Sequence, residues 1–545
     1  MKRKDFFKKG LGAAVATTFI PNPWLLGNTD NTSIFPDDLS KDSPNNPNSL
    51  LGTNENPNIN EFPTYFQLDN PLSPDWNRVR SEFSINPKIT FLNNGTMGIT
   101  PTPVLKSLNN AFQHAASEAA YPHADGSLEK LIAEITGAKD TEIAITKNVS
   151  EGVNLACWAM DLKADDEILI TKHEHVGGCA PWLHRAQMDG VKLVVVELGS
   201  DATSTYANFV AAATTKTKVL AIPHIPCTIG QILPIKELCS WAKSRGILTA
   251  IDGAHPLGMV QFNIKELGCD YYSGCLHKWV LGPLGTGWFY ASEEILAKSA
   301  IRHVAAYSVD KFDMSTTPPS MGDLVNKTGR YSYGTFSGPL YTGAKTALKF
   351  YQHLGVKSVE TRIKYLSAVV YYHLLCINQN TNKSLAESNS KTKSSIKKLP
   401  SVTPSLEDWL RFHFGNQSWI PTSAGMANGI STGNTKSATI ANTISNQTIQ
   451  QWAIKHQKSP LLEILTPFES QSRGAQIGFR IASDKKPSYS QKFCDYARSK
   501  GMILRYVGEN NIDCVRVSTH YYNQLDEINV FISHLKDFFK QEQLG

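Results

Sequence analysis

The chain has 545 residues, of which 41% are hydrophobic, 10% aromatic and 19% charged. This composition excludes a disordered or coiled-coil protein, and the length predicts two or three structural units rather than one core. The formal net charge is +6, but +4 of it comes from the first nine residues, where Asp5 stands among Lys2, Arg3, Lys4, Lys8 and Lys9. The remaining chain is near neutral, so we expect no nucleic-acid-binding surface.

The first 27 residues have the layout of a bacterial export signal, with a basic start and a short apolar segment. Residues 3–8, Arg-Lys-Asp-Phe-Phe-Lys, resemble the twin-arginine motif with its second arginine replaced by lysine. The apolar segment is interrupted by Gly10 and Gly12 and is shorter than the ~20 residues that span a bilayer. We therefore expect a periplasmic protein with no stable membrane span. The alternative is a basic tail on a cytoplasmic protein.

Residues 28–75 are polar and rich in Asn, Pro and Ser, which predicts a flexible linker that cannot bury a core. Order is expected to begin near Trp76, at the start of a large domain over residues 76–345. A short strand, a glycine-bearing loop and a helix opened by prolines follow. Asn94 in this loop is either a substrate contact or part of a structural turn.

Two later junctions between a strand and a helix carry polar residues suited to a ligand. The strand Ile143–Thr146 runs through a polar turn into a helix, whose first backbone N–H groups, with Ser150, suit a phosphate. A simple helix cap is the alternative interpretation of Ser150. His175 follows the next apolar strand, at the strand end where open α/β sheets place their ligands, or it is an ordinary loop histidine.

The stretch from Ile247 to Lys278 carries the densest set of candidate residues. An apolar strand ends on Asp252, His255 follows three residues later, and a second apolar element delivers His277 and Lys278 before a Gly/Pro-rich turn. Apolar strands that alternate with amphipathic helices predict a largely parallel sheet covered on both faces. Asp252 is thus expected at the carboxyl edge of a buried strand, where its charge needs a cationic partner.

A smaller carboxyl-terminal domain is predicted over residues 346–545. It begins with helical patterns and ends with strands and helices typical of an α+β domain. Between them, about residues 379–457 are of low complexity and predict a mostly flexible insertion. The aromatic stretch LEDWLRFHFGNQSWIP within it is expected to dock on the protein.

Six short motifs follow one another as KNVSEGVN, EHV, DGAH, LHKW, RYSYGT and RVSTHYYN. In this order they resemble the class V aminotransferase family of fold-type I pyridoxal-phosphate enzymes, from about Phe91 to the carboxyl end outside the insertion. DGAH and GCLHKW are most similar to the isopenicillin N epimerase-like branch. The resemblance implies an α/β fold-type I architecture, with a large domain built on a mainly parallel seven-stranded sheet between helices and a smaller α+β C-terminal domain.

The resemblance also implies pyridoxal 5′-phosphate as the cofactor and a role for each candidate residue. Lys278 would hold the cofactor as a Schiff base and move the Cα proton of the substrate. Asp252 would pair with the ring nitrogen, and His175 would stack on the ring. His255 would lie near the phenolic oxygen. The phosphate would be held by three groups, namely the Val149 N–H, Ser150 and His277.

The expected partners follow from the same resemblance. Gly334 and Thr335 would reach the phosphate of a neighbouring subunit, which implies a homodimer with active sites at the interface. Arg516 would bind the carboxylate of a small amino-acid or peptide substrate with its planar fork, and Asn94 would contact the same substrate. The substrate itself stays open, as does the choice between transamination, epimerisation and elimination. Export would favour an exported peptide or a siderophore as the substrate.

Two other functions compete with this interpretation. A cysteine desulfurase or selenocysteine lyase needs a nucleophilic cysteine after the strand ILRYV, in a pattern resembling RxGHHC. The segment RYVGENNIDCVRV is shorter, and its Cys514 falls in a strand position typical of a core residue. The other alternative is an exported binding protein without catalysis, which the joint presence of Lys278, Asp252 and Arg516 argues against.

The cysteines carry no separate site of their own. All nine are scattered without a CxxC pair, which argues against a disulfide or zinc framework, so no metal site is expected. Cys227 stands where desulfurases of the family use a cofactor-binding Asn, and Cys275 stands where some members carry a phosphate-binding Ser. Whether these two thiols touch the cofactor stays open.

Overall fold

The structure is a computed structural model, and it describes eight ranges of the chain: 62–67, 70–119, 125–299, 302–332, 334–389, 403–415, 444–482 and 487–544. All of them fall in one compact unit, residues 59–545. The predicted export signal and most of the predicted linker lie outside the described residues. Within the described ranges, no helix is long and apolar enough to cross a membrane.

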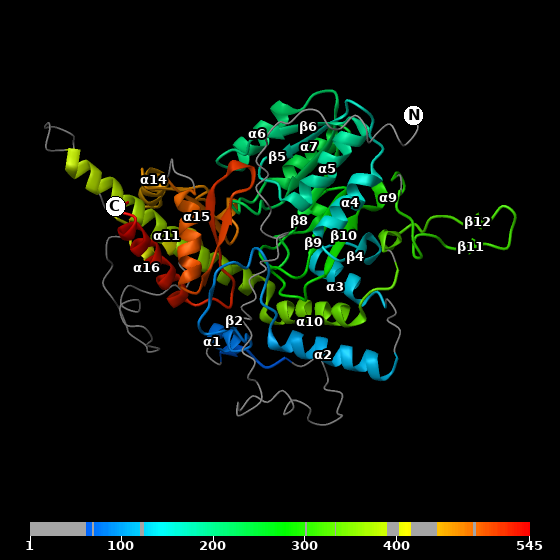
Figure 1. Ribbon diagram of the computed structural model, residues 1–545, viewed down its shortest axis with the longest axis horizontal. Coiled ribbons are helices and arrows are strands. Elements are labelled where there is room, and N and C mark those ends of the chain that lie inside the picture. The colour runs from blue at the N-terminus through cyan, green and yellow to red at the C-terminus, as the bar shows by residue number, and fades with distance from the viewer. Residues whose placement is uncertain are drawn as a thin grey trace, which may run out of the picture. The chain divides into compact units, whose positions relative to one another are not determined.

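The large domain is built on a seven-stranded sheet with the order β4-β10-β9-β8-β7-β5-β6 (Figure 1). Its strands are β4 (Ile143–Thr146), β5 (Glu167–Thr171), β6 (Lys192–Val196), β7 (Thr217–Pro223), β8 (Leu248–Gly253), β9 (Tyr271–Cys275) and β10 (Gly287–Ala291). The pairings among β6, β5, β7, β8 and β9 are parallel, whereas β10 pairs antiparallel with β4 and β9. The prediction of a mainly parallel seven-stranded sheet is therefore confirmed.

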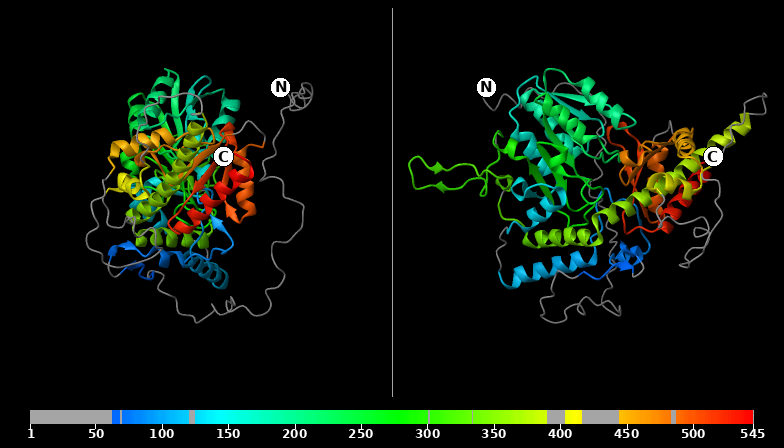
Figure 2. Two further views of the ribbon diagram at one scale, coloured as in Figure 1. Left: turned by 90° about the vertical axis from the view of Figure 1, so that its left-hand side faces the viewer. Right: turned by 180° about the vertical axis from the view of Figure 1, so that it is seen from behind.

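Helices cover both faces of this sheet (Figures 1 and 2). The hydrophobic core on one face contains side chains of α2 (Thr102–Ser117), α3 (Ser127–Thr136), α6 (Ala202–Ala212), α7 (Ile235–Ser244) and α10 (Gly338–Leu354). The core on the other face contains side chains of α4 (Val149–Ala159), α5 (Val176–Asp189) and α9 (Glu293–Leu296). In β8, Ile251 enters the first core and Ala250 the second. Because alternate residues of a strand face opposite sides, a strand buried on both faces is apolar throughout.

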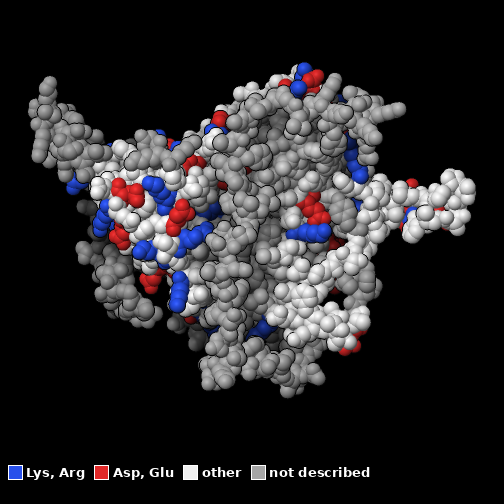
Figure 3. Space-filling view, viewed as in Figure 1, with Lys and Arg blue, Asp and Glu red and all other residues white. Residues whose placement is uncertain are grey.

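The small domain is an antiparallel sheet packed against helices. Its order is β13-β14-β17-β16, with β13 (Leu462–Ile464), β14 (Gln476–Ile481), β17 (Cys514–Ser518) and β16 (Arg505–Val507). The helices are α11 (Val356–Asn389), α12 (Leu406–Phe414), α14 (Asn446–His456), α15 (Tyr489–Ser499) and α16 (Leu525–Gln541). On the face shown in Figure 3, basic and acidic side chains of this domain alternate, so the described residues present no patch of one sign there.

Shorter elements complete the described chain. They are β1 (Phe66–Gln67), β2 (Asn70–Pro74), α1 (Trp76–Arg80), β3 (Thr90–Phe91), α8 (Ile264–Leu267), β11 (Phe312–Asp313), β12 (Ser320–Met321) and β15 (Met502–Ile503). β3 pairs in parallel with β15, so the start of the large domain is tied to the small domain. The β11–β12 hairpin projects away from the seven-stranded sheet (Figure 1).

Two sequence-based boundaries differ from the structure. Order begins before Trp76, because Tyr65 is fully buried, donates its hydroxyl to Glu82 at 2.9 Å and packs edge-on against Phe350. The predicted flexible linker is therefore wrong at its carboxyl end. One aromatic side chain within a polar segment is enough to anchor it once a pocket between helices receives that side chain.

The predicted insertion also differs where it is described. α11 continues to Asn389, and α12 and α14 are formed inside the range that was expected to be flexible. Trp409 of α12 is fully buried and donates its indole N–H to the carbonyl oxygen of Ala368 at 2.9 Å. The expectation that this aromatic stretch docks is thus confirmed for its described part, residues 406–415, which packs on the small-domain core, whereas residues 416–421 lie outside the described residues.

Candidate active site

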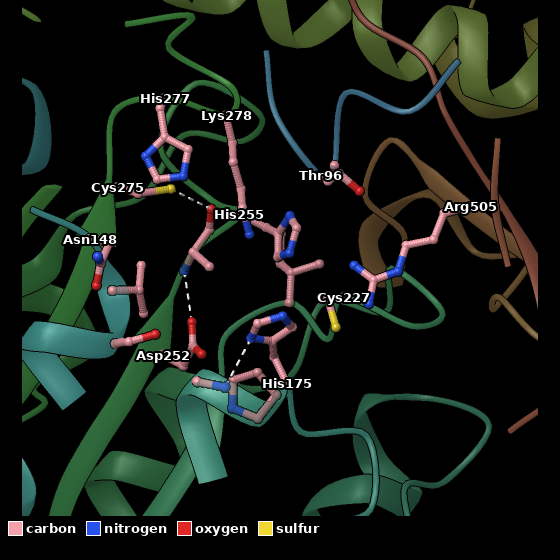
Figure 4. A pocket seen from close by; sticks show the side chains of 17 residues that line it. Thr96, Asn148, His175, Cys227, Asp252, His255, Cys275, His277, Lys278 and Arg505 are labelled. Carbon is pink, nitrogen blue, oxygen red and sulfur yellow. Dashed lines mark hydrogen bonds between the residues drawn. The ribbon is translucent and has the colours of Figure 1, made fainter. Parts of the chain in front are cut away.

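A cavity of ≈ 220 Å³ lies at the carboxyl ends of β5, β7, β8 and β9 (Figure 4). This is the edge at which a parallel sheet offers loops to a ligand. The structure brings seven of the predicted residues together in its lining: Val149, Ser150, His175, Asp252, His255, His277 and Lys278. They come from helix starts and strand ends that lie up to 129 residues apart in the sequence, from Val149 to Lys278.

Asp252 lies at the end of β8 and is 9% exposed. One carboxylate oxygen accepts a hydrogen bond from the Ala254 backbone N–H at 2.9 Å. Burial raises the pKa of this carboxyl, while the Ala254 bond and the positive charge of Lys278 lower it. No side chain of the described ranges forms an ion pair with Asp252, so its negative charge is available for a cation in the cavity.

Lys278 follows the turn after β9, and its side chain points toward the middle of the cavity, with Asp252 and His175 across from it (Figure 4). The backbone of Lys278 is held by Asn94, whose side-chain amide donates a hydrogen bond to the Lys278 carbonyl oxygen at 3.3 Å. A Cβ added at Gly98 would lie 2.2 Å from the same oxygen, so only glycine permits this approach. The chain therefore holds the lysine backbone rigidly and leaves its amine in the cavity.

His175 caps the start of α5, where its Nδ1 accepts a hydrogen bond from the Gly177 N–H at 3.1 Å. This bond places the proton of the neutral ring on Nε2. Burial lowers the pKa of His175 to about 4, and the positive charges of Lys278 and Arg505 act in the same direction. Near pH 7 the ring is uncharged and presents a flat face to a ligand.

His255 is oriented by a residue that the sequence did not single out. The Trp279 indole N–H donates to His255 Nδ1 at 3.0 Å, so the His255 proton lies on Nε2. The ring is 2% exposed, burial lowers its pKa well below the ordinary value, and Nε2 has no partner within the described residues. A buried N–H donor without an acceptor is costly, which indicates that a ligand oxygen belongs beside it.

The start of α4 closes the cavity opposite the small domain. Asn148 caps this helix, because its Oδ1 accepts a hydrogen bond from the Glu151 N–H at 3.0 Å. The first N–H groups of the helix, including that of Val149, take no part in the hydrogen bonds within the helix and can serve a ligand. Ser150 and His277 line the same end of the cavity. Because the N-terminus of a helix attracts negative charge, this end fits a phosphate.

Two glycines at the start of α5 let this helix approach the site closely. A Cβ at Gly177 would lie 2.2 Å from Ser150 Oγ, and a Cβ at Gly178 would lie 2.7 Å from Asp252 Oδ2. Gly178 also separates Asp252 from Glu174, whose Oε1 accepts hydrogen bonds from the Thr171 backbone and hydroxyl at 3.2 and 3.0 Å. Burial, together with the nearby negative charge of Asp252, raises the pKa of Glu174 to about 8.

We expect Glu174→Gln to stabilise the cofactor-free protein at pH 9 and to change it little at pH 5. The folded pKa of about 8 exceeds the ordinary 4.5, so the native state keeps a proton that the unfolded chain releases, and stability falls as pH rises through this window. Glutamine cannot ionise but keeps the acceptor for Thr171, so the gain at pH 9 should be about 2–4 kcal/mol. Urea unfolding at both pH values, with the surface change Glu237→Gln as the control, measures it. An equal gain at both pH values would mean that packing, not charge, is responsible.

Two predicted substrate residues do not line the cavity. Asn94 is fully buried between the Lys278 carbonyl and the Tyr522 hydroxyl, which donates to its Oδ1 at 3.0 Å. Arg516 is also fully buried, and Nη1 donates to the Cys227 carbonyl at 2.8 Å. Asn94 supports the backbone of Lys278 in this structure, and its contact with a substrate stays a prediction.

Gly334 and Thr335 lie in a different cavity of ≈ 920 Å³. Asn148 lines both cavities, so the two adjoin at the start of α4. Within this chain neither residue borders the smaller cavity. Their predicted contact with a phosphate concerns a neighbouring subunit, and it stays a prediction.

Three cysteines flank the site in different ways. Cys227 and Cys275 line the cavity, and burial raises the pKa of both thiols, that of Cys275 to about 11. Cys275 donates to the Ala254 carbonyl oxygen at 3.2 Å. Cys514 is fully buried in β17 outside the cavity, and burial raises its pKa to about 12. At pH 7 all three are protonated thiols, and Cys514 is a core residue as expected.

Sequence reasoning missed three polar residues of the lining, namely Thr96, Asn148 and Arg505. Asn148 carries a recognisable signal, since Asn before an apolar helix is a favoured cap. Arg505 is the register partner of Arg516 on the neighbouring strand, and no local pattern shows which of the two faces the cavity.

The chain is similar to known proteins in sequence. A family model described as aminotransferase class-V matches residues 100–399, more than half of the chain. The isopenicillin N epimerase of Streptomyces clavuligerus is 31% identical over 225 residues, which cover 40% of this chain and 56% of the epimerase. A probable cysteine desulfurase of Xylella fastidiosa (strain 9a5c) is 26% identical over 311 residues, 54% of this chain and 73% of that protein. The match thus spans little more than half the length of the epimerase.

The fold is similar to solved structures over most of the chain. A C-DES variant with glycine covalently linked to its PLP cofactor superposes with a TM-score of 0.61 at 20% identity, covering 84% of this chain and 99% of that one. The apo cysteine desulfurase of Thermococcus onnurineus NA1 gives a TM-score of 0.60 at 18% identity, with 85% and 98% covered. These matches show an α/β fold of fold-type I.

Proposed function

Because the chain belongs to the class-V aminotransferase family of pyridoxal-phosphate enzymes, we propose that it transforms an amino acid or small peptide at Cα. The reaction is an aminotransferase or isopenicillin N epimerase-like one, and an exported peptide or siderophore is a fitting substrate. The observation that carries the proposal is the meeting of Lys278 and Asp252 in one cavity. A base and an unpaired buried carboxylate in the same enclosed space suit proton transfer beside a cationic ring.

The residues present fit the cofactor at three points. Asp252 supplies a buried carboxylate without a cationic partner in the described ranges, and His255 Nε2 is a buried donor without an acceptor. The start of α4 offers outward N–H groups to a phosphate. When bound, pyridoxal 5′-phosphate supplies an electron-accepting ring that stabilises negative charge at Cα.

Each residue then has a physical task. Asp252 would hold the ring nitrogen in its protonated form, and the neutral His175 ring would cover one face and exclude water from it. His255 Nε2–H would donate to the phenolic oxygen, while Val149, Ser150 and His277 would hold the phosphate. Lys278 Nζ would take the proton from Cα. Return of a proton to the opposite face of Cα would give inversion, whereas delivery of the proton to the aldehyde carbon of the cofactor would lead to transfer of the amino group.

A cysteine desulfurase or selenocysteine lyase is the second candidate. It is favoured by relatives that carry this name and by a thiol, Cys227, in the cavity lining. The loop between β16 and β17, residues 508–513, contains no cysteine. One of the two thiols of the lining, Cys227 or Cys275, would then have to serve as the sulfur acceptor. A binding protein without catalysis is the third candidate, and the retained Lys278 argues against it.

Two further parts of the proposal concern location and assembly. Export to the periplasm is supported by the basic start and apolar segment of residues 1–27. A homodimer is supported by Gly334 and Thr335, which border the cavity adjoining Asn148. A second subunit placed over that cavity would bring its own Gly334 and Thr335 toward the phosphate end of the site.

The test is exchange of the Cα hydrogen for deuterium in heavy water. Protein loaded with pyridoxal 5′-phosphate is incubated with L- and D-amino acids and short peptides, and mass spectrometry and chiral chromatography follow the label, inversion, keto acids and released sulfide. We expect label at Cα for a subset of compounds, followed by inversion or keto acid. Sulfide without inversion would favour the desulfurase. A protein with no visible cofactor band and no label above that of free cofactor would overturn the proposal.

A further inference from the structure

Two buried carboxyl groups lie next to one another at the carboxyl end of the sheet. Glu174, just before α5, is 5% exposed, and Asp252, in β8, is 9% exposed. The position that a Cβ on Gly178 would occupy is 2.7 Å from Asp252 Oδ2 and 3.6 Å from Glu174 Oε2. Because glycine leaves that position open, the two carboxyl groups face one another without a side chain between them.

The space between them is a small cavity of ≈ 10 Å³. Its lining contains Glu174, Asp252 and Ser273 of β9, and its other residues are apolar side chains and Gly178 from α4, α5, β7 and β8. A cavity of about 10–15 Å³ holds one water molecule when at least two polar groups can bind it. This cavity therefore suits a single water that joins the two carboxyl groups, and its apolar walls separate the pair from solvent.

The surroundings of Asp252 favour its ionised form. Its Oδ1 accepts a hydrogen bond from the Ala254 N–H at 2.9 Å, and it lines the larger cavity together with Lys278. Burial raises the pKa of Asp252, but the Ala254 bond and the positive charge of Lys278 both lower it. Asp252 is therefore the member of the pair that carries the negative charge.

Glu174 has no cation beside it in the described part of the chain, where the charged group that acts on it is Asp252. The titratable neighbours of Glu174 are uncharged near pH 7, because burial lowers the pKa of His173 and of His175 to about 4 and raises that of the Cys179 thiol to about 11. From α4, β7 and β9, the small cavity receives uncharged side chains. Two ionised carboxylates repel one another in such an interior, so one of them keeps its proton.

The hydrogen bonds of Glu174 decide where this proton lies. Glu174 Oε1 accepts the backbone N–H and the hydroxyl of Thr171, at 3.2 and 3.0 Å. The proton therefore belongs on Oε2, the oxygen on the side of Gly178 and Asp252. Burial, together with the charge of Asp252, raises the pKa of Glu174 to about 8. At neutral pH this acid has an O–H donor directed toward Asp252.

We propose that Glu174 and Asp252 share one proton, which Glu174 holds and donates to Asp252 through one water, so that the pair presents a single negative charge to the ring nitrogen of the cofactor. Glu174 is a positioning residue, since it touches neither cofactor nor substrate. The inference rests on the proposed function and deepens it. A cation at the ring nitrogen stabilises a second negative charge nearby, so cofactor binding makes Glu174 release its proton to solvent more easily.

The first measurement tests the shared proton without cofactor. Wild type, Glu174→Gln, Asp252→Asn and the double variant are unfolded with urea at pH 6 and pH 9, and their unfolding constants form a double-mutant cycle. Glutamine keeps the acceptor for Thr171 and an N–H donor toward Asp252, so it copies the protonated acid. The same cycle with the surface change Glu237→Gln in place of Glu174→Gln is the matched control.

We expect the effects of Glu174→Gln and Asp252→Asn to multiply at pH 6, where glutamine replaces a neutral acid. At pH 9 each single variant removes the repulsion between two carboxylates, so the second substitution adds little. The unfolding constant of the double variant should then differ at least about tenfold from the product of the separate effects. The control cycle should show no coupling at either pH.

The second measurement is the affinity of the cofactor-free protein for pyridoxal 5′-phosphate, followed by its visible band from pH 6 to pH 9. The titrations of the cofactor and of Lys278 are common to wild type and Glu174→Gln, so they cancel in the ratio of the two dissociation constants. We expect equal affinities at pH 6. At pH 9 wild type should bind about 3- to 10-fold more tightly, because only wild type gains a second negative charge near the ring cation.

Two outcomes would overturn the inference alone. Multiplying effects at pH 9 would show that the two carboxyl groups do not interact. An affinity that Glu174→Gln lowers equally at both pH values would show that Glu174 only supports the packing of the site. A protein that binds no pyridoxal 5′-phosphate would overturn the proposed function and the role at the ring, whereas coupling at pH 9 in the same protein would still support the shared proton, so the two failures are distinct.

Discussion

Lys278→Ala is expected to lower the rate of Cα deuterium exchange by a factor of at least about 10⁴, the upper range for loss of a positioned general base. Lys278 is the one lysine of the cavity lining, and its backbone is fixed by Asn94 and by the close approach of Gly98. No other amine among the described residues of the lining can replace it. The visible band of the covalently held cofactor should be lost as well, since alanine cannot form the bond to it.

Lys243→Ala provides the control for this experiment. Lys243 lies on α7 and pairs with Glu294 at 2.9 Å on the surface, so its loss removes a lysine without touching the site. Rates and spectra are compared for wild type and both variants at equal cofactor loading. Normal exchange in Lys278→Ala would show that a different group moves the Cα proton, and the assignment of the base would be wrong.

The parallel sheet and most of the cavity lining could be predicted because both follow from local sequence. A strand covered on both faces is mostly apolar along its length, as β8 and β9 are, and its charged residues gather near its end. Asp252, His255, His277 and Lys278 stand within a few residues of such ends. Since parallel strands end at one edge, neighbouring strand ends bring these residues together without further information.

The placement of the two arginines could not be predicted in the same way. Arg516 donates hydrogen bonds to Cys227 and Asn93, which lie 289 and 423 residues away in the sequence. Arg505 faces the cavity only because β16 pairs with β17 in one register. A shift of one residue would turn its side chain to the other face, and nothing local reports that register.

Two buried aromatic side chains in polar segments show a related limit. Trp409 lies between segments of low complexity, and its burial depends on a surface of α11 that is formed by distant residues. Tyr65 is a single aromatic residue in a polar stretch, and the side chain of Phe350 that receives it belongs to α10. The average composition of such a segment predicts that it is flexible. One large aromatic side chain can nevertheless anchor the segment when another part of the fold forms a pocket that receives it.

Asp252→Asn is expected to change catalysis and stability in opposite directions. Asparagine keeps the oxygen that accepts the Ala254 N–H, so the turn after β8 should be preserved. It removes the negative charge that would hold the ring nitrogen protonated, and we expect Cα exchange to fall by about 10³-fold, as for loss of a preorganised electrostatic contact. The cofactor should also bind more weakly, because the buried carboxylate is its proposed ionic partner.

The cofactor-free variant should in contrast be more stable than wild type, because burial disfavours the Asp252 charge and Glu174 lies nearby as a second carboxyl. The pKa of Asp252 is raised in the folded protein, so the unfolded chain releases the Asp252 proton first as the pH rises above the ordinary pKa of 3.8. The gain in stability of the variant over wild type should therefore appear above that pH. Urea unfolding with and without cofactor separates the two effects. Without cofactor, the variant should have a higher free energy of unfolding than wild type. Addition of cofactor should raise that free energy less in the variant than in wild type. If the variant is less stable than wild type both with and without cofactor, Asp252 is a structural residue. If the variant keeps the wild-type rate of Cα deuterium exchange, the protonated ring nitrogen does not depend on the charge of Asp252.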